Sequence, residues 1–122
     1  MLLHSFFDIV SEEIQDQSAF YVIRLNKEHP IFQGHFPGYP ITPGVCVIQM
    51  AVDLFSQQCK KDYVIHQVKN VKFLHIIQPD ETPLVNYQLT WQVIDNQEYR
   101  LTAIVQQADI TYAKIDLILR NE

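Results

Sequence analysis

Residues 45–61 limit most strongly how this chain can fold, because they predict a helix that is apolar on nearly every side. Within residues 45–55 the only polar side chains are those of Gln49 and Asp53. Thr42 supplies a hydroxyl for the N-cap and Pro43 suits the first helical position, so the start of the helix is also marked. A helix without a polar face has to be covered by other elements. The sequence therefore predicts one buried helix.

Much of the remaining chain alternates apolar and polar residues with the period of a β-strand. In residues 85–93 every odd position is apolar and every even position is polar. Turn candidates at residues 95–97 and 108–109 join this segment to two further strands. Strands are predicted at residues 19–25, 63–77, 85–93, 99–105 and 110–119. One buried helix with several antiparallel strands is an α+β architecture, which we expect as a single domain over residues 1–122.

The charge balance and the apolar pattern exclude several classes of function. Nine Lys and Arg residues against fourteen Asp and Glu residues give a net charge of −5. The basic field that holds nucleic acid is therefore missing. No run approaches the ~18 apolar residues of a membrane span, and the first residues lack a basic leader with a cleavage site. We expect a cytoplasmic protein that binds no nucleic acid and has no membrane span.

The cysteines and histidines predict neither a disulfide nor a metal site. Cys46 and Cys59 lie thirteen positions apart, which corresponds to ~20 Å along one helix and exceeds the ~7 Å Cα separation that a disulfide spans. The sequence has no Cys-x-x-Cys pair, and its histidines show no metal-ligand spacing. We expect two buried structural thiols, with a reactive thiol as the lesser alternative, and no metal.

The segment most informative about chemistry is residues 34–45, Gly-His-Phe-Pro-Gly-Tyr-Pro-Ile-Thr-Pro-Gly-Val. It closely resembles the signature of the bacterial 3-hydroxyacyl-acyl-carrier-protein dehydratases. Residues 70–74, Asn-Val-Lys-Phe-Leu, resemble the next strand of that family, and residues 78–81 resemble its Pro-Gly-Asp turn with Asp80 in place of the glycine. The resemblance is strong over residues 32–51, fair up to residue 89, and thin at both ends.

This resemblance implies the hot-dog fold, in which a long antiparallel sheet wraps round a central helix, and a dimer whose active sites take residues from both subunits. It implies the removal of water from a 3-hydroxyacyl thioester to give the trans-2-enoyl thioester, without a cofactor. The implied partner is an acyl carrier protein with a phosphopantetheine-linked acyl chain, and the implied assembly is a homodimer or a larger even oligomer. The sequence leaves open the chain length and the pathway, which are compatible with fatty-acid, lipopolysaccharide or polyene-pigment synthesis.

Two catalytic roles of the family fall on matching residues. His35 matches the catalytic histidine, whose imidazole titrates near neutral pH and takes the C2 proton. Gly44 matches the glycine that opens the helix, whose backbone N–H binds the thioester oxygen as negative charge develops. We expect His35 to be the base and Gly44 to supply the oxyanion contact.

The third role departs from the family. The helical position fourteen residues after His35, where the family carries Glu or Asp, is Gln49. An amide forms hydrogen bonds but does not exchange protons at a useful pKa, and the loss of one general acid or base typically costs ~10²–10⁴ in rate. Either His35 makes both proton transfers while Gln49 positions groups, or Asp53, one turn further along, supplies the acid. The first alternative ranks higher, because Asp53 lies deeper along the helix, where a carboxylate that finds a partner is a better interpretation than an acid. A core amide with no catalytic role is an equally balanced interpretation of Gln49.

Four residues could line an acyl tunnel, namely Phe32, Phe36, Tyr39 and Ile48. Aromatic residues beside a loop usually just fill the core, which is the alternative interpretation of the three aromatic residues. The densest basic set is formed by Lys60, Lys61, Lys69 and Lys72. An acidic carrier protein could bind there, but a solvated face is the simpler interpretation.

The expected function is therefore an enzyme, a dehydratase acting on a carrier-bound 3-hydroxyacyl chain. One alternative is a catalytically weakened acyl-binding subunit that completes the active site of a partner dehydratase in a mixed dimer. Another is a hot-dog thioesterase, which also needs a carboxylate and is not favoured by Gln49.

Overall fold

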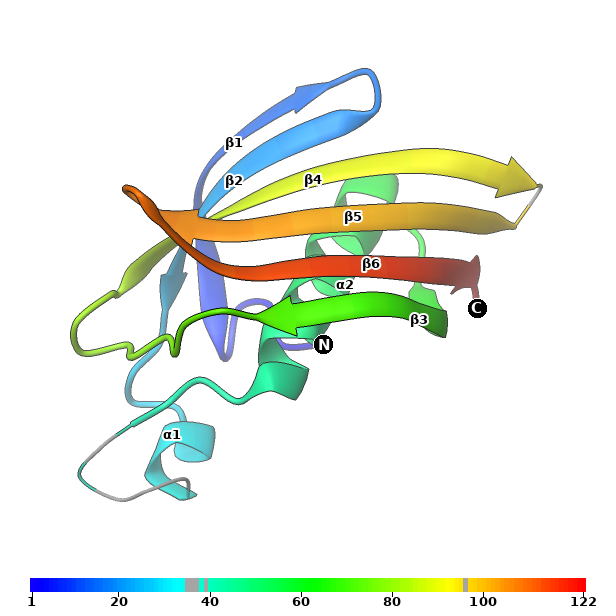
Figure 1. Cartoon of the computed structure of the whole chain (residues 1–122). Coiled ribbons are helices and arrows are strands. Elements are labelled where there is room, and N and C mark those ends of the chain that lie inside the picture. The colour runs from blue at the N-terminus through cyan, green and yellow to red at the C-terminus, as the bar shows by residue number, and fades with distance from the viewer. Residues whose placement is uncertain (35–37, 39, 96) are drawn as a thin grey trace.

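The computed structural model describes residues 1–34, 38, 40–95 and 97–122. Within them the chain forms six strands and two helices (Figure 1). In chain order these elements are β1 (Phe7–Gln15), β2 (Ser18–Leu25), α1 (Pro30–Gly34), α2 (Gly44–Cys59), β3 (Tyr63–Phe73), β4 (Leu84–Asp95), β5 (Glu98–Gln107) and β6 (Ile110–Asn121).

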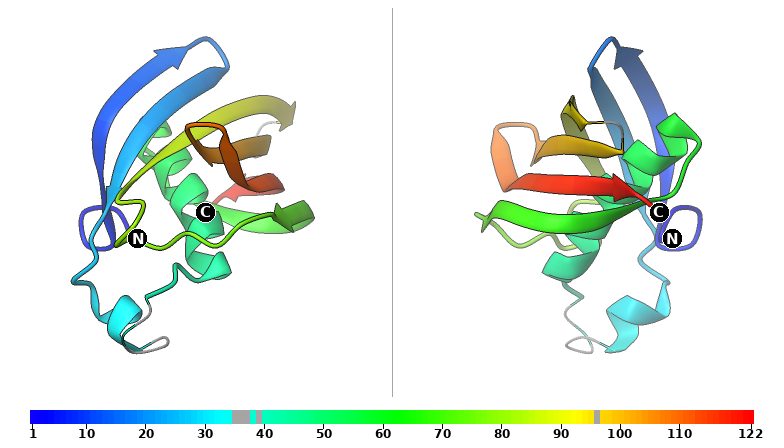
Figure 2. Two further views of the ribbon diagram at one scale, coloured as in Figure 1. Left: turned by 60° about the vertical axis from the view of Figure 1, so that its left-hand side comes forward. Right: turned by 90° about the vertical axis from the view of Figure 1, so that its right-hand side faces the viewer.

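The strands form a single antiparallel sheet in the order β1-β2-β4-β5-β6-β3. The sheet curves round α2, which lies in its concave side (Figures 1 and 2). The predicted α+β architecture, an antiparallel sheet wrapped round one central helix, is confirmed. Strand β3 follows α2 directly in the chain but lies at the edge of the sheet, next to β6.

Helix α2 is buried as its sequence predicts. Nine of its sixteen residues are buried, among them Asp53 and Ser56. The ring of Phe55 contacts those of Tyr63, Trp91 and Tyr99 at centroid distances of 5.0, 5.5 and 5.2 Å. Such aromatic contacts add to the free energy of burial. They fix the C-terminal half of the helix against the sheet.

The N-terminal half of α2 is fixed by Tyr87 of β4. Its hydroxyl donates a hydrogen bond of 2.8 Å to the carbonyl oxygen of Val47. Tyr87 is fully buried, and this burial raises the pKa of its phenol well above the usual value. The phenol therefore stays protonated and keeps donating to the helix.

The predicted cap of α2 is wrong. The N-cap residue is Pro43, in an extended conformation and without a side-chain hydrogen bond, and Thr42 lies one position too early to cap the helix. The N–H of Thr42 instead donates to the carbonyl oxygen of Ile77 at 2.9 Å. The end of the helix comes earlier than predicted, because Lys60 adopts a left-handed conformation and its N–H bonds back to Gln57.

Two strand predictions also need correction. β1 was not expected, because Ser11, Glu12 and Glu13 interrupt the apolar pattern and a bulge between Ile9 and Ser11 shifts its phase. β3 ends at Phe73 rather than at residue 77, because the N–H groups of the next two residues both turn to the carbonyl oxygen of Tyr112.

Candidate active site

The candidate active site is centred on the N-terminus of α2, where N–H groups remain open. The first bonds of the helix run from the N–H groups of Cys46 and Val47 to the carbonyl oxygen of Pro43. The preceding N–H groups, those of Gly44 and Val45, have no acceptor among the described residues. Open N–H groups and the helix dipole make this end attractive to a negatively charged oxygen.

A largely apolar cavity of about 200 Å³ lies beside these N–H groups. Gly44 and Val47 contribute the helical side, and Phe73 and Ala113 contribute the strand side. The other lining residues are Ile41, Thr42, His75, Ile76, Ile77 and Tyr112. A small apolar cavity with a few polar groups is typical of a site for a small organic ligand.

Thr42 is a buried polar residue in the lining of this cavity. The residue is only 6% exposed, and its Oγ1 has no hydrogen-bond partner within the described part of the chain. A buried hydroxyl without a partner is unfavourable unless a water or a ligand satisfies it. The cavity therefore offers open backbone N–H groups to an otherwise apolar ligand, and the buried hydroxyl of Thr42 belongs to a residue of its wall.

Gln49 and Asp53 lie one turn apart on α2 and are hydrogen-bonded to each other. The Nε2 of Gln49 donates to the Oδ1 of Asp53 at 2.9 Å. The backbone N–H of Leu2 donates to the other oxygen, Oδ2, at 2.5 Å. Asp53 is only 3% exposed. Since both of its oxygens accept from N–H groups, a structural role suits Asp53 better than that of the general acid.

The other predicted site residues are only partly described by the structure. His35, Phe36 and Tyr39 lie outside the described residues. Phe32 is 2% exposed and stacks on Phe6 at a centroid distance of 4.8 Å, which matches the alternative that it fills the core. Ile48 is half-buried and packs against the core. Of the predicted residues that the structure describes, Gly44 alone is among those that line the cavity.

Sequence reasoning missed Phe73, His75 and Tyr112 as members of this site. Phe73 and Ala113 are register partners on β3 and β6, and their strands were predicted without the pairing that brings both beside α2. His75 was dismissed for lack of metal spacing, yet it lines the cavity and its ring lies 6.5 Å from that of Tyr112. His75 reaches the cavity because the chain turns after Phe73, which the sequence alone does not indicate.

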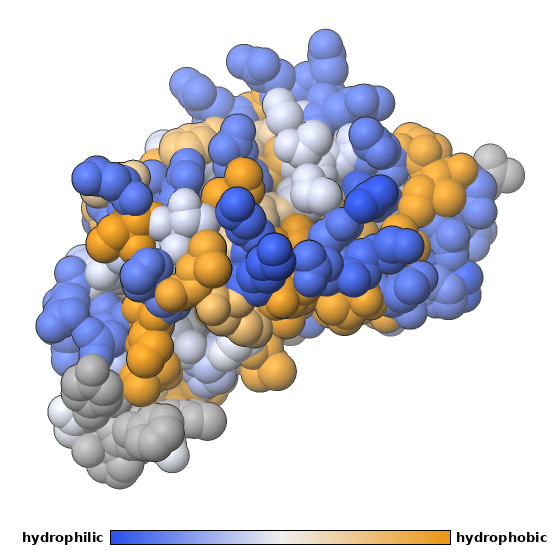
Figure 3. Space-filling view, viewed as in Figure 1, coloured by the Kyte–Doolittle hydropathy of each residue, from blue (hydrophilic) through white to orange (hydrophobic). Residues whose placement is uncertain are grey.

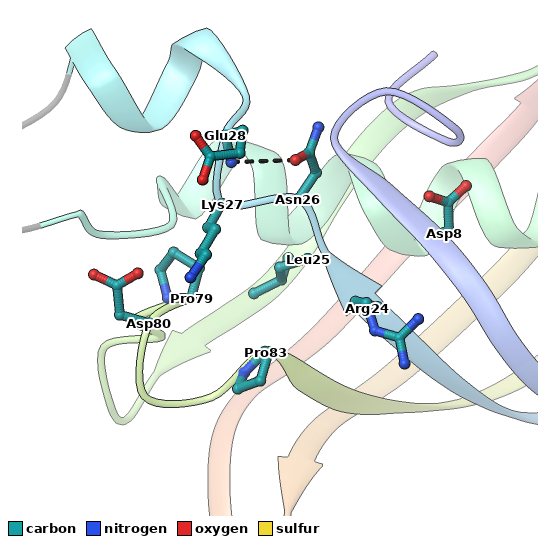
Figure 4. A pocket seen from close by; sticks show the side chains of 9 residues that line it. All are labelled: Asp8, Arg24, Leu25, Asn26, Lys27, Glu28, Pro79, Asp80 and Pro83. Atoms are coloured by element: carbon teal, nitrogen blue, oxygen red, sulfur yellow. Dashed lines mark hydrogen bonds between the residues drawn. The ribbon is translucent and has the colours of Figure 1, made fainter.

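A second hollow, of about 420 Å³, is lined by described residues that include none of the predicted site residues (Figure 4). Its walls carry both Arg24 and Lys27 and the carboxylates of Asp8, Glu28 and Asp80. Charges of both signs nearly cancel across it, so it favours neither an anion nor a cation. Its composition points to no specific chemistry.

Neither cysteine is suited to be a nucleophile. Cys46 and Cys59 are both free thiols; Cys46 is buried as predicted, whereas Cys59 is half-buried. Burial raises the pKa of each thiol above its usual value. Both therefore stay protonated near neutral pH.

In the described part of the chain, no group of three or more His, Cys, Asp or Glu residues is arranged to hold a metal, and no helix is long and apolar enough to cross a membrane.

Solved structures with low sequence identity share this fold. The dehydratase heterocomplex ApeI:P from Xenorhabdus doucetiae superposes with a TM-score of 0.71 at 21% identity, over 93% of this chain and 96% of that chain. A hypothetical thioesterase from Streptococcus pneumoniae TIGR4, solved with coenzyme A, gives a TM-score of 0.65 at 9% identity, over 98% and 90% of the two chains. The wrapped sheet and its central helix define a hot-dog protein.

Sequence similarity narrows this class to one family. The family described as ApeI-like, ApeI dehydratase, matches residues 11–113. The chain therefore belongs to the ApeI-like family of hot-dog dehydratases. Curated relatives include the 3-hydroxyacyl-[acyl-carrier-protein] dehydratase FabZ of Wolbachia pipientis wMel, 27% identical over 76% of this chain and 70% of the relative. The FabZ of Rickettsia akari is 24% identical over 94% and 85% of the two chains.

Proposed function

We propose that the protein is a (3R)-3-hydroxyacyl-[acyl-carrier-protein] dehydratase that forms trans-2-enoyl thioesters in fatty-acid or related acyl-chain biosynthesis. The observation that carries this proposal is the apolar cavity at the uncapped N-terminus of α2. Its apolar walls suit an acyl chain, and the open N–H groups suit a thioester oxygen. The FabZ relatives, which bear the name of this activity, support the choice of reaction and of carrier protein.

In the proposed mechanism, the thioester oxygen accepts hydrogen bonds from the N–H groups at the start of α2. Removal of the C2 proton moves negative charge onto this oxygen, where fixed N–H donors and the positive helix end stabilise it. Because Gly44 has no side chain, the ring of Phe73 can lie against this end of the helix and form a wall of the cavity beside the N–H groups. The acyl chain beyond C3 then occupies the apolar cavity.

His35 makes both proton transfers in this proposal. Its imidazole takes the proton from C2, the C3–O bond breaks, and the same imidazolium returns the proton to the departing oxygen. Water leaves, and the enzyme ends in the protonation state in which it began. A histidine can serve in both directions because its pKa lies near neutral pH. The resemblance to the dehydratase family assigns this role to His35.

We also propose that the active protein is a homodimer formed along β3. This strand lies at the edge of the sheet, where its outward N–H and C=O groups have no neighbouring strand in the described part of the chain. Val64, Val68 and Phe73 of β3 are 42%, 51% and 52% exposed, and apolar side chains show among the charged ones on this face (Figure 3). A second copy paired along β3 supplies hydrogen-bond partners for these N–H and C=O groups and covers the exposed apolar side chains.

A mixed dimer is the second candidate function. The structural neighbour from Xenorhabdus doucetiae is a dehydratase heterocomplex, and Gln49 stands where this chain lacks the family's acid. In this alternative the chain binds an acyl group and completes the site of a partner dehydratase that supplies the carboxylate. A thioesterase, suggested by the Streptococcus pneumoniae neighbour, shares the fold but needs a carboxylate that Gln49 does not provide.

Mass spectrometry of a 3-hydroxyacyl carrier protein incubated with the purified protein separates these functions. Loss of one water from the carrier-bound chain supports the dehydratase. An unchanged substrate that loses water only after a partner dehydratase is added supports the mixed dimer. Release of the free acid supports the thioesterase.

A further inference from the structure

We propose that Asp53 is a positioning residue that holds Gln49 with its carbonyl oxygen facing the substrate, so that position 49 accepts the hydrogen bond of the 3-hydroxyl group. This inference rests on the proposed dehydratase function and adds a role for the buried carboxylate. It starts from the hydrogen bond of 2.9 Å between Nε2 of Gln49 and Oδ1 of Asp53.

The orientation of the Gln49 amide follows from the chemistry of its partner. An ionised carboxylate only accepts hydrogen bonds, whereas an amide has a donating NH₂ end and an accepting carbonyl end. The reverse orientation would place the carbonyl oxygen of Gln49 against a carboxylate oxygen, two acceptors without a proton between them. Asp53 therefore turns the NH₂ group toward itself and the oxygen Oε1 away.

Asp53 is itself fixed by a contact from the far end of the chain. The backbone N–H of Leu2 donates to its Oδ2 at 2.5 Å, and the side chain is buried between the N-terminal segment and the helix. A charge-assisted hydrogen bond of this kind is stronger than a neutral one. The carboxylate therefore has one fixed orientation to impose on Gln49, which is itself half-buried.

An outward acceptor at position 49 suits dehydration by a single histidine. When the 3-hydroxyl donates its hydrogen to Oε1 of Gln49, the lone pairs of the hydroxyl oxygen stay free to receive the proton from the imidazolium of His35. The C3–O bond then breaks and water leaves with both hydrogens. An outward NH₂ group would instead donate to the same lone pairs and compete with the imidazolium.

The variant Asp53→Asn separates this role from a purely structural one. The single carbonyl oxygen of the new asparagine can keep the bond from the N–H of Leu2, which leaves its NH₂ group facing residue 49. Gln49 then flips, presents its oxygen to that NH₂ group and turns its own NH₂ group toward the substrate. The substitution keeps the size of the side chain and inverts the polarity that position 49 offers.

The orientation is tested first by nuclear magnetic resonance on the uncomplexed protein, whether or not it turns over substrate. The side-chain amide signals of Gln49 are identified by their loss in Gln49→Leu. We expect one of its protons to exchange slowly in the parent protein and this protection to disappear in Asp53→Asn. Asp116→Asn is the matched control, because this carboxylate binds Arg100 and should leave the Gln49 signals unchanged. A Gln49 amide that exchanges as fast in the parent as those of exposed glutamines overturns the proposal, even if Asp53→Asn does not fold.

Kinetics then test the effect on the reaction. We expect Asp53→Asn to lower kcat about tenfold, the scale of one misdirected hydrogen bond. The exchanged pair Gln49→Glu/Asp53→Asn should recover the rate, because a carboxyl at position 49 accepts from the amide at position 53 and still offers an oxygen outward. Its rate should also acquire a pH dependence from that carboxyl, which the parent lacks. A protected Gln49 amide without turnover contradicts the proposed function alone, whereas turnover insensitive to Asp53→Asn contradicts the positioning role.

Discussion

The backbone of Gly44 lies directly against the ring of Phe73. A Cβ atom at position 44 would stand 2.8 Å from Cζ of that ring and 3.1 Å from Cε2, closer than such atoms approach without a shift. The first residue of the central helix and the last residue of the edge strand β3 thus meet at one wall of the cavity. Glycine at position 44 permits this close approach of the ring, and the backbone angles of Gly44 are not of the left-handed kind.

Gly44→Ala should therefore impair activity far more than stability. Phe73 is 52% exposed, so its ring can swing aside and the clash can be relieved at the cost of the cavity wall. Alanine also stabilises a helix relative to glycine, and we expect a net change in unfolding free energy within about 1 kcal/mol. The dehydration rate should fall by about tenfold or more, the scale of one weakened oxyanion contact. Thermal unfolding and steady-state kinetics measure the two effects.

The matched control for this prediction is Gly44→Ala/Phe73→Ala. Removing the ring gives the new methyl group room, so part of the lost activity should return. Equal activity in the single and the double variant would show that the contact with Phe73 is not the cause.

His35→Ala should abolish turnover and leave the fold intact, because His35 makes both proton transfers in the proposed mechanism. His75→Ala is the comparison, since His75 lines the same cavity but has no assigned proton transfer. We expect it to change the rate by less than about tenfold. If His75→Ala is inactive and His35→Ala is not, the assignment of the base is wrong.

Gln49→Glu should increase the rate of dehydration by ~10²-fold, the scale of one restored general acid. The new carboxyl would lie within hydrogen-bond reach of Asp53, as Gln49 does at 2.9 Å. Two carboxyls this close share one proton, and the pKa at which this shared proton is lost is raised. The group is then protonated near neutral pH, as a general acid must be. A folded variant that is no faster would show that the missing acid does not limit the parent.

The same variant should lose stability as the pH rises. A carboxyl whose pKa is higher in the folded than in the unfolded state makes the unfolded state bind fewer protons above its ordinary pKa of about 4.3. The loss in unfolding free energy relative to the parent should therefore be absent in acid, grow above about pH 4.3, and level off above the raised pKa. Urea unfolding at several pH values measures it. An equal deficit at all pH values would point to packing rather than to a shared proton.

Val68→Lys should convert the proposed dimer into a monomer. Val68 is 51% exposed on the edge strand, and a lysine there opposes strand-to-strand pairing. Light scattering should give about twice 14.3 kDa for the parent and about 14.3 kDa for the variant. Ile110→Lys is the control, because Ile110 is also exposed but is the first residue of β6, directly after the β5–β6 turn, and is not part of the edge strand. A monomeric parent at micromolar concentration would contradict both the dimer and the shared site.

The sequence predicted the parts of the fold that depend on local patterns. The apolar residues of α2 and the strict alternation along β4 each carry a period that burial imposes. The cap of α2 was misplaced, because Thr42 and Pro43 match the usual capping pattern one residue too early. β1 was missed because its charged residues face solvent at an edge, and only its pairing with β2 reveals it as a strand.

The site was predictable where a residue's role follows from its own sequence motif. The position of Gly44 at the start of the helix could be predicted because it lies within a recognisable segment. Phe73 and Tyr112 could not, because they reach the cavity through the pairing of β3 with β6. The contact between Leu2 and Asp53 joins residues fifty-one positions apart, and no periodicity indicates such a bond. The sequence favoured Asp53 as a helix-face carboxylate with a partner over Asp53 as an acid, but it did not identify Gln49 and Leu2 as the partners.

The most direct test of the central claim is the reverse reaction in heavy-oxygen water. A trans-2-enoyl thioester on a carrier protein is incubated with the purified protein alone, and mass spectrometry locates any labelled oxygen in the product. If the protein is a dehydratase, labelled oxygen should appear at C3 in the 3-hydroxyacyl product, and the label should be absent with His35→Ala. Failure of the purified parent protein to introduce label at C3 would contradict the claim that this chain is itself a dehydratase.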